Sequence, residues 1–272
     1  MAVSFISMFS YDFILRALVV GTLVSLCAAL LGVSLVLKRY SMIGDGLSHV
    51  GFGAIAFALV LNLAPLSVAI PVVVLAAFLL LRVSNNSKIQ GDAAIAMIST
   101  GTLALGVFAI SLKSGMNVDM SSFMFGSILA MDKSDVTLSI ILSLLVLLLF
   151  LVFYPRIFAV TFDEEFAKAT GVKVELYNGL IAFLAAITIV LGMRMMGALL
   201  ISSLVIFPPL SAMEIFKTFR GVVISSALLS VFCFITGLIL SYIVAAPTGA
   251  SVVLMNVAVF ILCYGIRVAT ER

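Results

Sequence analysis

The sequence predicts an all-α, polytopic membrane protein with about nine (eight to nine) transmembrane helices. Of its 272 residues, 64% are hydrophobic and only 10% are charged, whereas soluble domains carry about 45–50% apolar and about 25% charged residues. Nine apolar stretches approach the ~20 residues that cross a bilayer core. The period-2 alternation of an outer-membrane barrel is absent. This composition excludes soluble enzymes, nucleic-acid-binding proteins and disordered regulators, so we expect a lipid bilayer and no nucleic acid among the partners.

The expected spans follow one another along residues 1–272, which we treat as a single transmembrane domain. They are residues 13–37, 43–63, 66–81, 93–112, 136–153, 176–193, 197–212, 222–246 and 250–266. The second span opens with Gly44-Asp45-Gly46, and the seventh contains Pro208-Pro209. Broken or short helices are tolerated in a membrane only where protein or a water-filled cavity covers the freed backbone. We therefore expect these two segments to line a pathway.

Basic residues predict the orientation. With the N-terminus outside, eleven of the fifteen Lys and Arg residues fall on the cytoplasmic side and four on the outer side, as the positive-inside rule requires. The cytoplasmic set is Lys38, Arg39, Arg82, Lys88, Arg156, Lys168, Lys173, Lys217, Arg220, Arg267 and Arg272. The C-terminus is then cytoplasmic. The alternative is eight spans, with one of the nine segments re-entrant. Separately, the Phe123-Met124-Phe125-Gly126 stretch of the outer segment 113–135 is a candidate for a re-entrant turn.

The strongest candidate site is the segment Gly44-Asp45-Gly46-Leu47-Ser48-His49. Ionisable groups inside a span cost several kcal/mol and indicate function. Asp45 and His49, the only histidine, lie four residues apart and therefore project from one helical face. A carboxylate and a neutral imidazole suit Zn²⁺, Mn²⁺ or Fe²⁺, and Ser48 is placed to orient a ligand or a water. A packing hydrogen bond or a metal-free proton relay is the alternative.

Two ligands are too few for a tetrahedral zinc site. A two-fold symmetric dimer with both pairs on its axis would supply four.

A second candidate is the cytoplasmic segment from Phe162 to Gly171, which predicts a short helix. Asp163 can cap its N-terminus, and Glu164 and Glu165 suit the positive end of the helix dipole. Lys168 falls in the last turn, and Gly171 can adopt the left-handed conformation after it. The spacing of Phe162 and Phe166 makes the segment amphipathic. A solvated helical loop without function is the simpler interpretation of this segment alone.

Several motifs in the same order resemble bacterial metal-ion ABC importer permeases of the ABC-3 type, the zinc and manganese permeases related to ZnuB, AdcB and MntB. The stretch from Leu35 to Val50 resembles the second-span signature of that family. The segments 162–172, 197–208 and 247–251 resemble its cytoplasmic coupling helix, its "GALLVSALLIIPA" stretch and the turn before its last span. Pro208-Pro209 stands where many members have Pro-Ala.

The resemblance implies the permease subunit of a four-part importer in the bacterial cell (inner) membrane. Two copies of the chain, as a homodimer, would pair with two copies of a separate cytoplasmic ATP-binding subunit, and an extracellular or periplasmic metal-binding protein would deliver the ion. The permease would not be an enzyme, because the partner hydrolyses ATP. This agrees with the absence of a G-x-x-x-x-G-K-[ST] phosphate loop. No cofactor would be permanently bound.

The resemblance also implies roles for residues. Asp45 and His49 would form the metal pathway with Ser48 as a helper, and the segment from Asp163 to Gly171 would couple to the ATPase through Asp163, Glu164, Glu165, Phe166, Lys168 and Gly171. The Asp-Gly-Leu-Ser-His sequence resembles zinc permeases more than manganese ones, so the expected substrate is Zn²⁺. A manganese or iron importer of the same family, or an ion-coupled secondary metal transporter, is the alternative.

Overall fold

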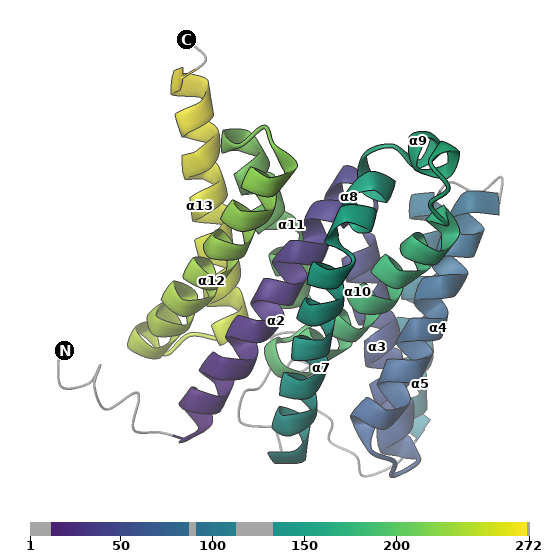
Figure 1. Cartoon of the computed structure of the whole chain (residues 1–272). Coiled ribbons are helices and arrows are strands. Elements are labelled where there is room, and N and C mark those ends of the chain that lie inside the picture. The colour runs from purple at the N-terminus through teal and green to yellow at the C-terminus, as the bar shows by residue number, and fades with distance from the viewer. Residues whose placement is uncertain (1–11, 87–90, 113–132, 271–272) are drawn as a thin grey trace.

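The computed structural model describes residues 12–86, 91–112 and 133–270, and these residues form helices without any strand. In chain order, and with the labels of Figure 1, the helices are α2 (Asp12–Leu37), α3 (Ile43–Val60), α4 (Pro65–Asn86), α5 (Gly91–Leu112), α7 (Lys133–Val152), α8 (Tyr154–Phe162), α9 (Glu164–Ala169), α10 (Val174–Met196), α11 (Ala198–Ile215), α12 (Phe219–Val244) and α13 (Thr248–Thr270).

Nine of the helices in the described ranges are long and apolar enough to span a membrane, all except α8 and α9. Each coincides with one of the nine segments expected from the sequence, and the ends differ by only a few residues. The helices of the described residues therefore support the nine-span prediction. The candidate re-entrant turn at residues 123–126 lies outside the described residues.

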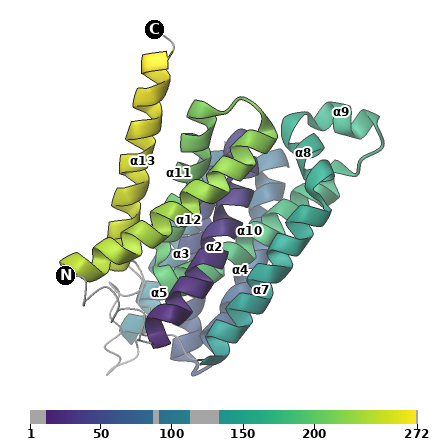
Figure 2. The ribbon, with the colours of Figure 1, turned by 60° about the vertical axis from the view of Figure 1, so that its left-hand side comes forward.

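The helices are arranged around a buried centre. Most of α2, α3 and α10 is buried, whereas α5, α7 and α13 expose most of their surface at the periphery. Helix α2 runs through the middle and packs against α10, α11 and α12 (Figures 1 and 2). Helix α13 stands at one edge beside α11 and α12, while α3, α4 and α5 pack together elsewhere in the bundle. The centre therefore combines early and late parts of the chain.

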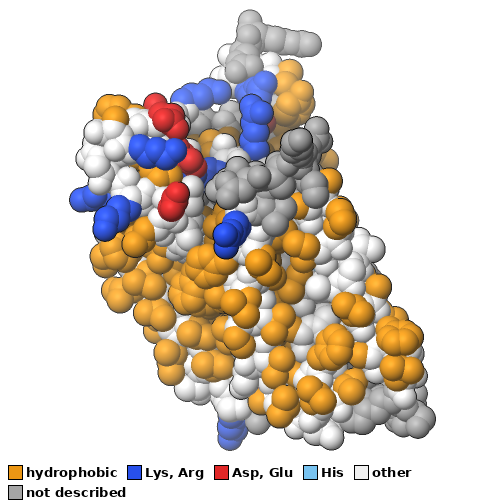
Figure 3. Space-filling model, turned by 90° about the vertical axis from the view of Figure 1, so that its right-hand side faces the viewer, with side chains coloured by type: hydrophobic (Ala, Val, Ile, Leu, Met, Phe, Trp, Pro, Cys, Tyr) orange, Lys and Arg blue, Asp and Glu red, His pale blue; other side chains and the backbone are white. Residues whose placement is uncertain are grey.

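Charged side chains gather at one end of the molecule, above a broad apolar band (Figure 3). The ends of α2, α4, α11 and α13 and the short helix α9 lie on that side (Figure 1). We call it the basic end, because it carries Lys38, Arg82, Lys168, Lys217 and Arg267. A wide apolar surface with charges at its margins is the arrangement that a bilayer requires.

Helix α11 is continuous through Pro208 and Pro209, contrary to the interruption that the sequence suggested. A proline has no N–H, so Pro209 leaves the carbonyl of Val205 without its usual partner four residues on. Gly32 of α2 lies directly against this carbonyl, and a Cβ placed on Gly32 would be 2.2 Å from the Val205 oxygen. The neighbouring helix thus covers the freed backbone, as tolerance of proline in a membrane helix requires.

Candidate functional site

Asp45 and His49 lie side by side on α3, as their spacing predicts. The Nε2 atom of His49 is 3.6 Å from Oδ2 of Asp45, a distance for an ion pair but too long for a good hydrogen bond. The side chains of His49 and Asp45 are 27% and 46% exposed. A nitrogen and a carboxylate oxygen therefore face the same accessible space, and an ion or a water can reach both.

The pair lies inside the bundle and not at its edge. Oγ of Ser202 on α11 is 3.5 Å from Oδ1 of Asp45. Ser202 is the fifth residue of α11, and Ile215 at the basic end is its last, so about 20 Å of helix separates them at ~1.5 Å per residue. Asp45 is nonetheless in the first turn of α3. The short α3 thus begins well within the molecule.

Ser202 has no role that its sequence context predicts, although the segment around it carries part of the family resemblance. Ser202 lies 157 residues from Asp45 in the chain, and its hydroxyl also donates to the carbonyl of Ala198. Nothing in the local sequence of α11 points to Asp45. Only the packing of α11 on α3 brings the two side chains together.

Ser48 is fully buried, and its hydroxyl donates to the backbone carbonyl of Asp45 over 2.7 Å. Through this hydrogen bond Ser48 stabilises the first turn of α3, which carries Asp45. Gly46 lies beside Asp45 and lets α5 approach, since a Cβ at this position would be 2.4 Å from Cγ2 of Ile95. The small residues around Asp45 therefore serve the packing of α3.

The donor set of one chain is limited to this pair. Within residues 12–86, 91–112 and 133–270, no group of three or more His, Cys, Asp or Glu side chains is close enough to hold a metal ion. A nitrogen and a carboxylate suit borderline divalent ions such as Zn²⁺ and Mn²⁺. Two such ligands favour a weak, exchangeable contact over a closed structural site, which has four.

The short helix at the basic end forms as the sequence predicts. Oδ1 of Asp163 accepts a hydrogen bond from the backbone N–H of Phe166 over 2.9 Å and caps α9. After the helix, Gly171 has φ +82°, the left-handed conformation that favours glycine. The ring of Phe166 is 64% exposed. Helix α9 therefore projects from the bundle and presents an aromatic side chain to its surroundings.

The two glutamates of α9 have different environments. Glu165 pairs with Lys168 over 3.1 Å, and both side chains are exposed. Glu164 instead accepts hydrogen bonds from Nζ of Lys38 at the end of α2, over 2.5 Å, and from Nδ2 of Asn178 on α10, over 3.1 Å. The side chain of Lys38 is only 7% exposed. Glu164 thus attaches α9 to the segment that leads into Asp45, a contact between residues 126 apart that no local sequence pattern predicts.

The environment of Glu164 favours its charged form. Partial burial raises the pKa of this carboxyl, but the hydrogen bonds from Lys38 and Asn178 and the charge of Lys38 outweigh burial and hold the pKa below its ordinary value. A carboxylate that accepts hydrogen bonds from a cation is stabilised in this way. The contact between α9 and α2 is therefore fully formed at neutral pH.

Comparison with known proteins gives a match along almost the whole chain. The ABC 3 transport family matches residues 10–266. The manganese transport system membrane protein MntC of Halalkalibacterium halodurans is 28% identical over 260 residues, covering 96% of this chain and 89% of MntC. The high-affinity zinc uptake system membrane protein ZnuB of Haemophilus influenzae is 29% identical over 252 residues, covering 93% and 97%.

Among solved structures, a chain of PsaBC from Streptococcus pneumoniae in complex with Fab superposes with a TM-score of 0.86. It is 27% identical, and the match covers 97% of this chain and 95% of that one.

Proposed function

Because the chain belongs to the ABC 3 transport family, we propose that it is the membrane permease of an ATP-driven importer of divalent transition metal, and that its substrate is zinc. The observation that carries this proposal is the family match over residues 10–266, together with relatives named for zinc and for manganese transport. The nine membrane-spanning helices of the described residues agree with a permease.

We assign the transport pathway to Asp45 and His49, with Ser48 and Ser202 as supporting hydroxyls. The proximity of one carboxylate oxygen and one imidazole nitrogen supports this role, as does their partial exposure. A metal ion in transit must bind well enough to enter and weakly enough to leave, and two ligands per chain suit that requirement. In a homodimer with the pairs on its axis, four ligands would meet the preference of Zn²⁺ for tetrahedral coordination.

We assign contact with a separate ATP-binding subunit to α9 and its caps. The exposed ring of Phe166 and the attachment of Glu164 to Lys38 support this role. Two ATP-binding subunits would move the two α9 helices together when ATP binds. Since Lys38 lies shortly before Asp45, this motion would reach the metal pair, which would open outward to receive the ion and inward to release it.

The proposed setting is the bacterial inner membrane, with the basic end and the C-terminus in the cytoplasm. The bias of Lys and Arg residues supports this orientation. A metal-binding protein would deliver the ion to the opposite, outer end. ATP hydrolysis would belong to the partner subunit, and the permease itself would bind no permanent cofactor.

The preference for zinc over manganese rests on the site. Mixed nitrogen and oxygen sites bind Zn²⁺ more tightly than Mn²⁺ in the usual order of affinities, and the Asp-Gly-Leu-Ser-His sequence resembles zinc permeases. Manganese is the second candidate, because relatives named for manganese are about as similar to this chain as the one named for zinc.

Uptake of radiolabelled Zn²⁺ and Mn²⁺ by metal-starved cells tests the proposal. The cells carry the permease with its ATP-binding and metal-binding partners, and the variants are Asp45→Asn and His49→Gln at matched expression. Glu175→Gln is the control, because Glu175 is an exposed carboxylate on α10. We expect both site variants to lower zinc uptake at least about tenfold, the equivalent of ~1.4 kcal/mol of lost ligand interaction, and the control to transport normally.

Three outcomes contradict parts of the proposal. Normal uptake by both site variants would show that the pair serves only helix packing. Preferential loss of manganese uptake would leave the family assignment intact but identify the substrate as Mn²⁺ and not Zn²⁺. Uptake that persists without the ATP-binding subunit would indicate an ion-coupled secondary transporter.

A further inference from the structure

Two adjoining cavities lie between α8, α12 and the end of α7. The aromatic cavity has a volume of about 560 Å³, and its walls include Tyr154, Phe158, Phe162, Phe219, Lys217 and Arg220. The apolar cavity has a volume of about 410 Å³, and its walls include Leu30, Phe150, Leu151, Val223 and Ile224. Tyr154, Pro155 and Arg220 line both cavities. The two cavities therefore adjoin at these three residues, and together we call them the groove.

The groove crosses the margin of the membrane region. The spanning part of α7 ends at Val152, and that of α12 begins at Phe219. The apolar cavity lies on the membrane side of these limits, where Leu151 and Ile224 are 66% and 62% exposed. The aromatic cavity lies mainly beyond them, against α8. One part of the groove thus faces hydrocarbon and the other faces the region of lipid headgroups.

The aromatic cavity is built by rings that contact one another. The ring of Phe219 lies 5.0 Å from Phe158, 5.6 Å from Tyr154 and 6.1 Å from Phe162 between centroids. Phe219 is buried, whereas Phe162 is exposed at the rim. Tyrosine is enriched at membrane interfaces because its apolar ring carries a polar hydroxyl, and Tyr154 supplies such a ring here beside the three phenylalanines. This cluster therefore suits the boundary between acyl chains and headgroups.

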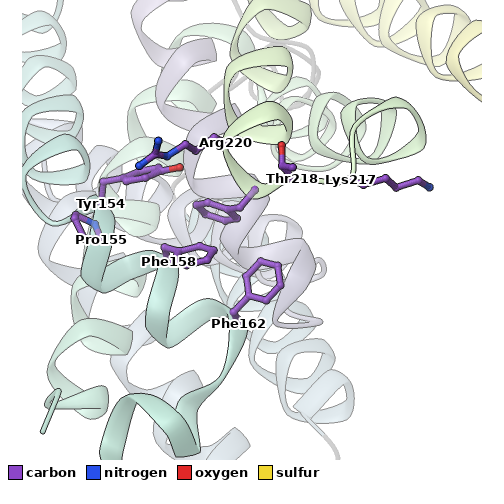
Figure 4. A pocket seen from close by; sticks show the side chains of 8 residues that line it. Tyr154, Pro155, Phe158, Phe162, Lys217, Thr218 and Arg220 are labelled. Atoms are coloured by element: carbon purple, nitrogen blue, oxygen red, sulfur yellow. The ribbon is translucent and has the colours of Figure 1, made fainter. Parts of the chain in front are cut away.

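The charge of the groove is entirely positive. No acidic side chain lines either cavity. Arg220 lies over Tyr154 within the groove, whereas Lys217 extends away from the rings at the rim (Figure 4). Both side chains are exposed, and none of the ion pairs found among the described residues includes either of them. A guanidinium that offers several donors is well suited to phosphate.

We propose that this groove binds an anionic phospholipid. The phosphate of its headgroup contacts Arg220, with Lys217 close to the outer part of the headgroup, and one acyl chain lies in the apolar cavity between α7 and α12. Arg220 lies at the membrane margin and Lys217 just beyond it, whereas the apolar part of the groove lies within the membrane, so the groove can match both a headgroup and an acyl chain. Basic pockets between membrane helices recognise anionic headgroups in this manner. The site is distinct from Asp45 and His49 and does not depend on the transported metal.

Native mass spectrometry of the full-length protein in a non-ionic detergent tests the proposal. Phosphatidylglycerol and phosphatidylcholine with identical acyl chains are titrated separately, and glycerol 3-phosphate is added as a competitor without chains. The variants are Arg220→Gln, which removes the cation, and Ile224→Trp, which fills the chain groove. Arg82→Gln is the matched control, because Arg82 is exposed at the same end and lines neither cavity. Thermal unfolding of each variant verifies that it is folded.

We expect the wild type to prefer phosphatidylglycerol. Arg220→Gln should reduce this preference about fivefold, which corresponds to the ~1 kcal/mol that one basic residue contributes near anionic lipid. Ile224→Trp should weaken the binding of both lipids, and Arg82→Gln should change the binding of neither. Equal binding of the two lipids, or equal effects of Arg220→Gln and Arg82→Gln, would overturn the proposal.

Two further results would also overturn it. Full displacement of lipid by glycerol 3-phosphate would indicate a site for free phosphate compounds. Loss of lipid on addition of the ATP-binding subunit would indicate that a protein surface covers the groove.

Discussion

The attachment of α9 to α2 through Lys38 and Glu164 gives the sharpest prediction about stability. Glu164→Gln keeps the size of the side chain and removes its charge, which leaves the buried ammonium of Lys38 without its partner. Glu165→Gln makes the same change one residue away, where the carboxylate pairs with exposed Lys168. Both glutamates occupy the first turn of α9, so any effect of the helix dipole is shared. The comparison therefore isolates the contact with Lys38.

The size of the expected loss of stability follows from how far the two paired side chains are exposed to water. Loss of one partner from a fully buried ion pair costs about 3–5 kcal/mol, whereas exposed pairs contribute about 0.2–1 kcal/mol. The side chain of Lys38 is 7% exposed and that of Glu164 is 43% exposed, so water screens only one partner. We expect Glu164→Gln to destabilise the attachment of α9 by about 1–2 kcal/mol, an intermediate value. For Glu165→Gln we expect less than about 0.5 kcal/mol.

Hydrogen–deuterium exchange of the α9 amides measures this difference. The N–H of Ala167 donates to Asp163 and that of Val172 donates to Ala167, so both amides exchange only when α9 opens. About 1.4 kcal/mol corresponds to tenfold faster exchange, and Glu165→Gln should accelerate it less than about threefold. Lys38→Met completes a double-mutant cycle with Glu164→Gln. Equal effects of the two glutamate variants, or no coupling in the cycle, would refute the reasoning.

Two other predictions concern pH and helix packing. The pKa of Glu164 is lowered by Lys38 and Asn178 despite burial, so its contribution to the attachment is complete above its ordinary value near 4.5 and is lost as the pH falls through the lower folded value. The chain contains no tryptophan; the fluorescence of a Phe166→Trp variant should therefore stay constant from neutral pH to about that value and change below it, and this change should disappear when Glu164→Gln is added. Gly32→Ala should lower thermal stability by about 1–3 kcal/mol, because its Cβ would meet a backbone oxygen. Gly101→Ala, with open space around it, should be neutral or stabilise by up to about 1 kcal/mol; equal effects of the two glycine variants would contradict the packing of α2 on α11.

Features that depend only on residues close together along the chain could be predicted from the sequence. The spans follow from runs of apolar residues, since each helix satisfies its own backbone hydrogen bonds wherever it packs. The cap at Asp163 and the left-handed Gly171 are likewise local. The proximity of Asp45 and His49 follows from their spacing of four residues on one helix. The metal role of this pair and the function of α9 remain proposals that extend these local features.

The tertiary structure decided the contacts between distant parts of the chain. Lys38 and Glu164 are 126 residues apart, and Asp45 and Ser202 are 157 apart. Pro208-Pro209 suggested a broken helix, yet α11 is continuous because Gly32 of α2 covers the carbonyl freed by the second proline. The physical reason is the same throughout. Hydropathy, capping and helical spacing act within a few residues, whereas the partner of each helix face is selected by the close packing of the whole bundle.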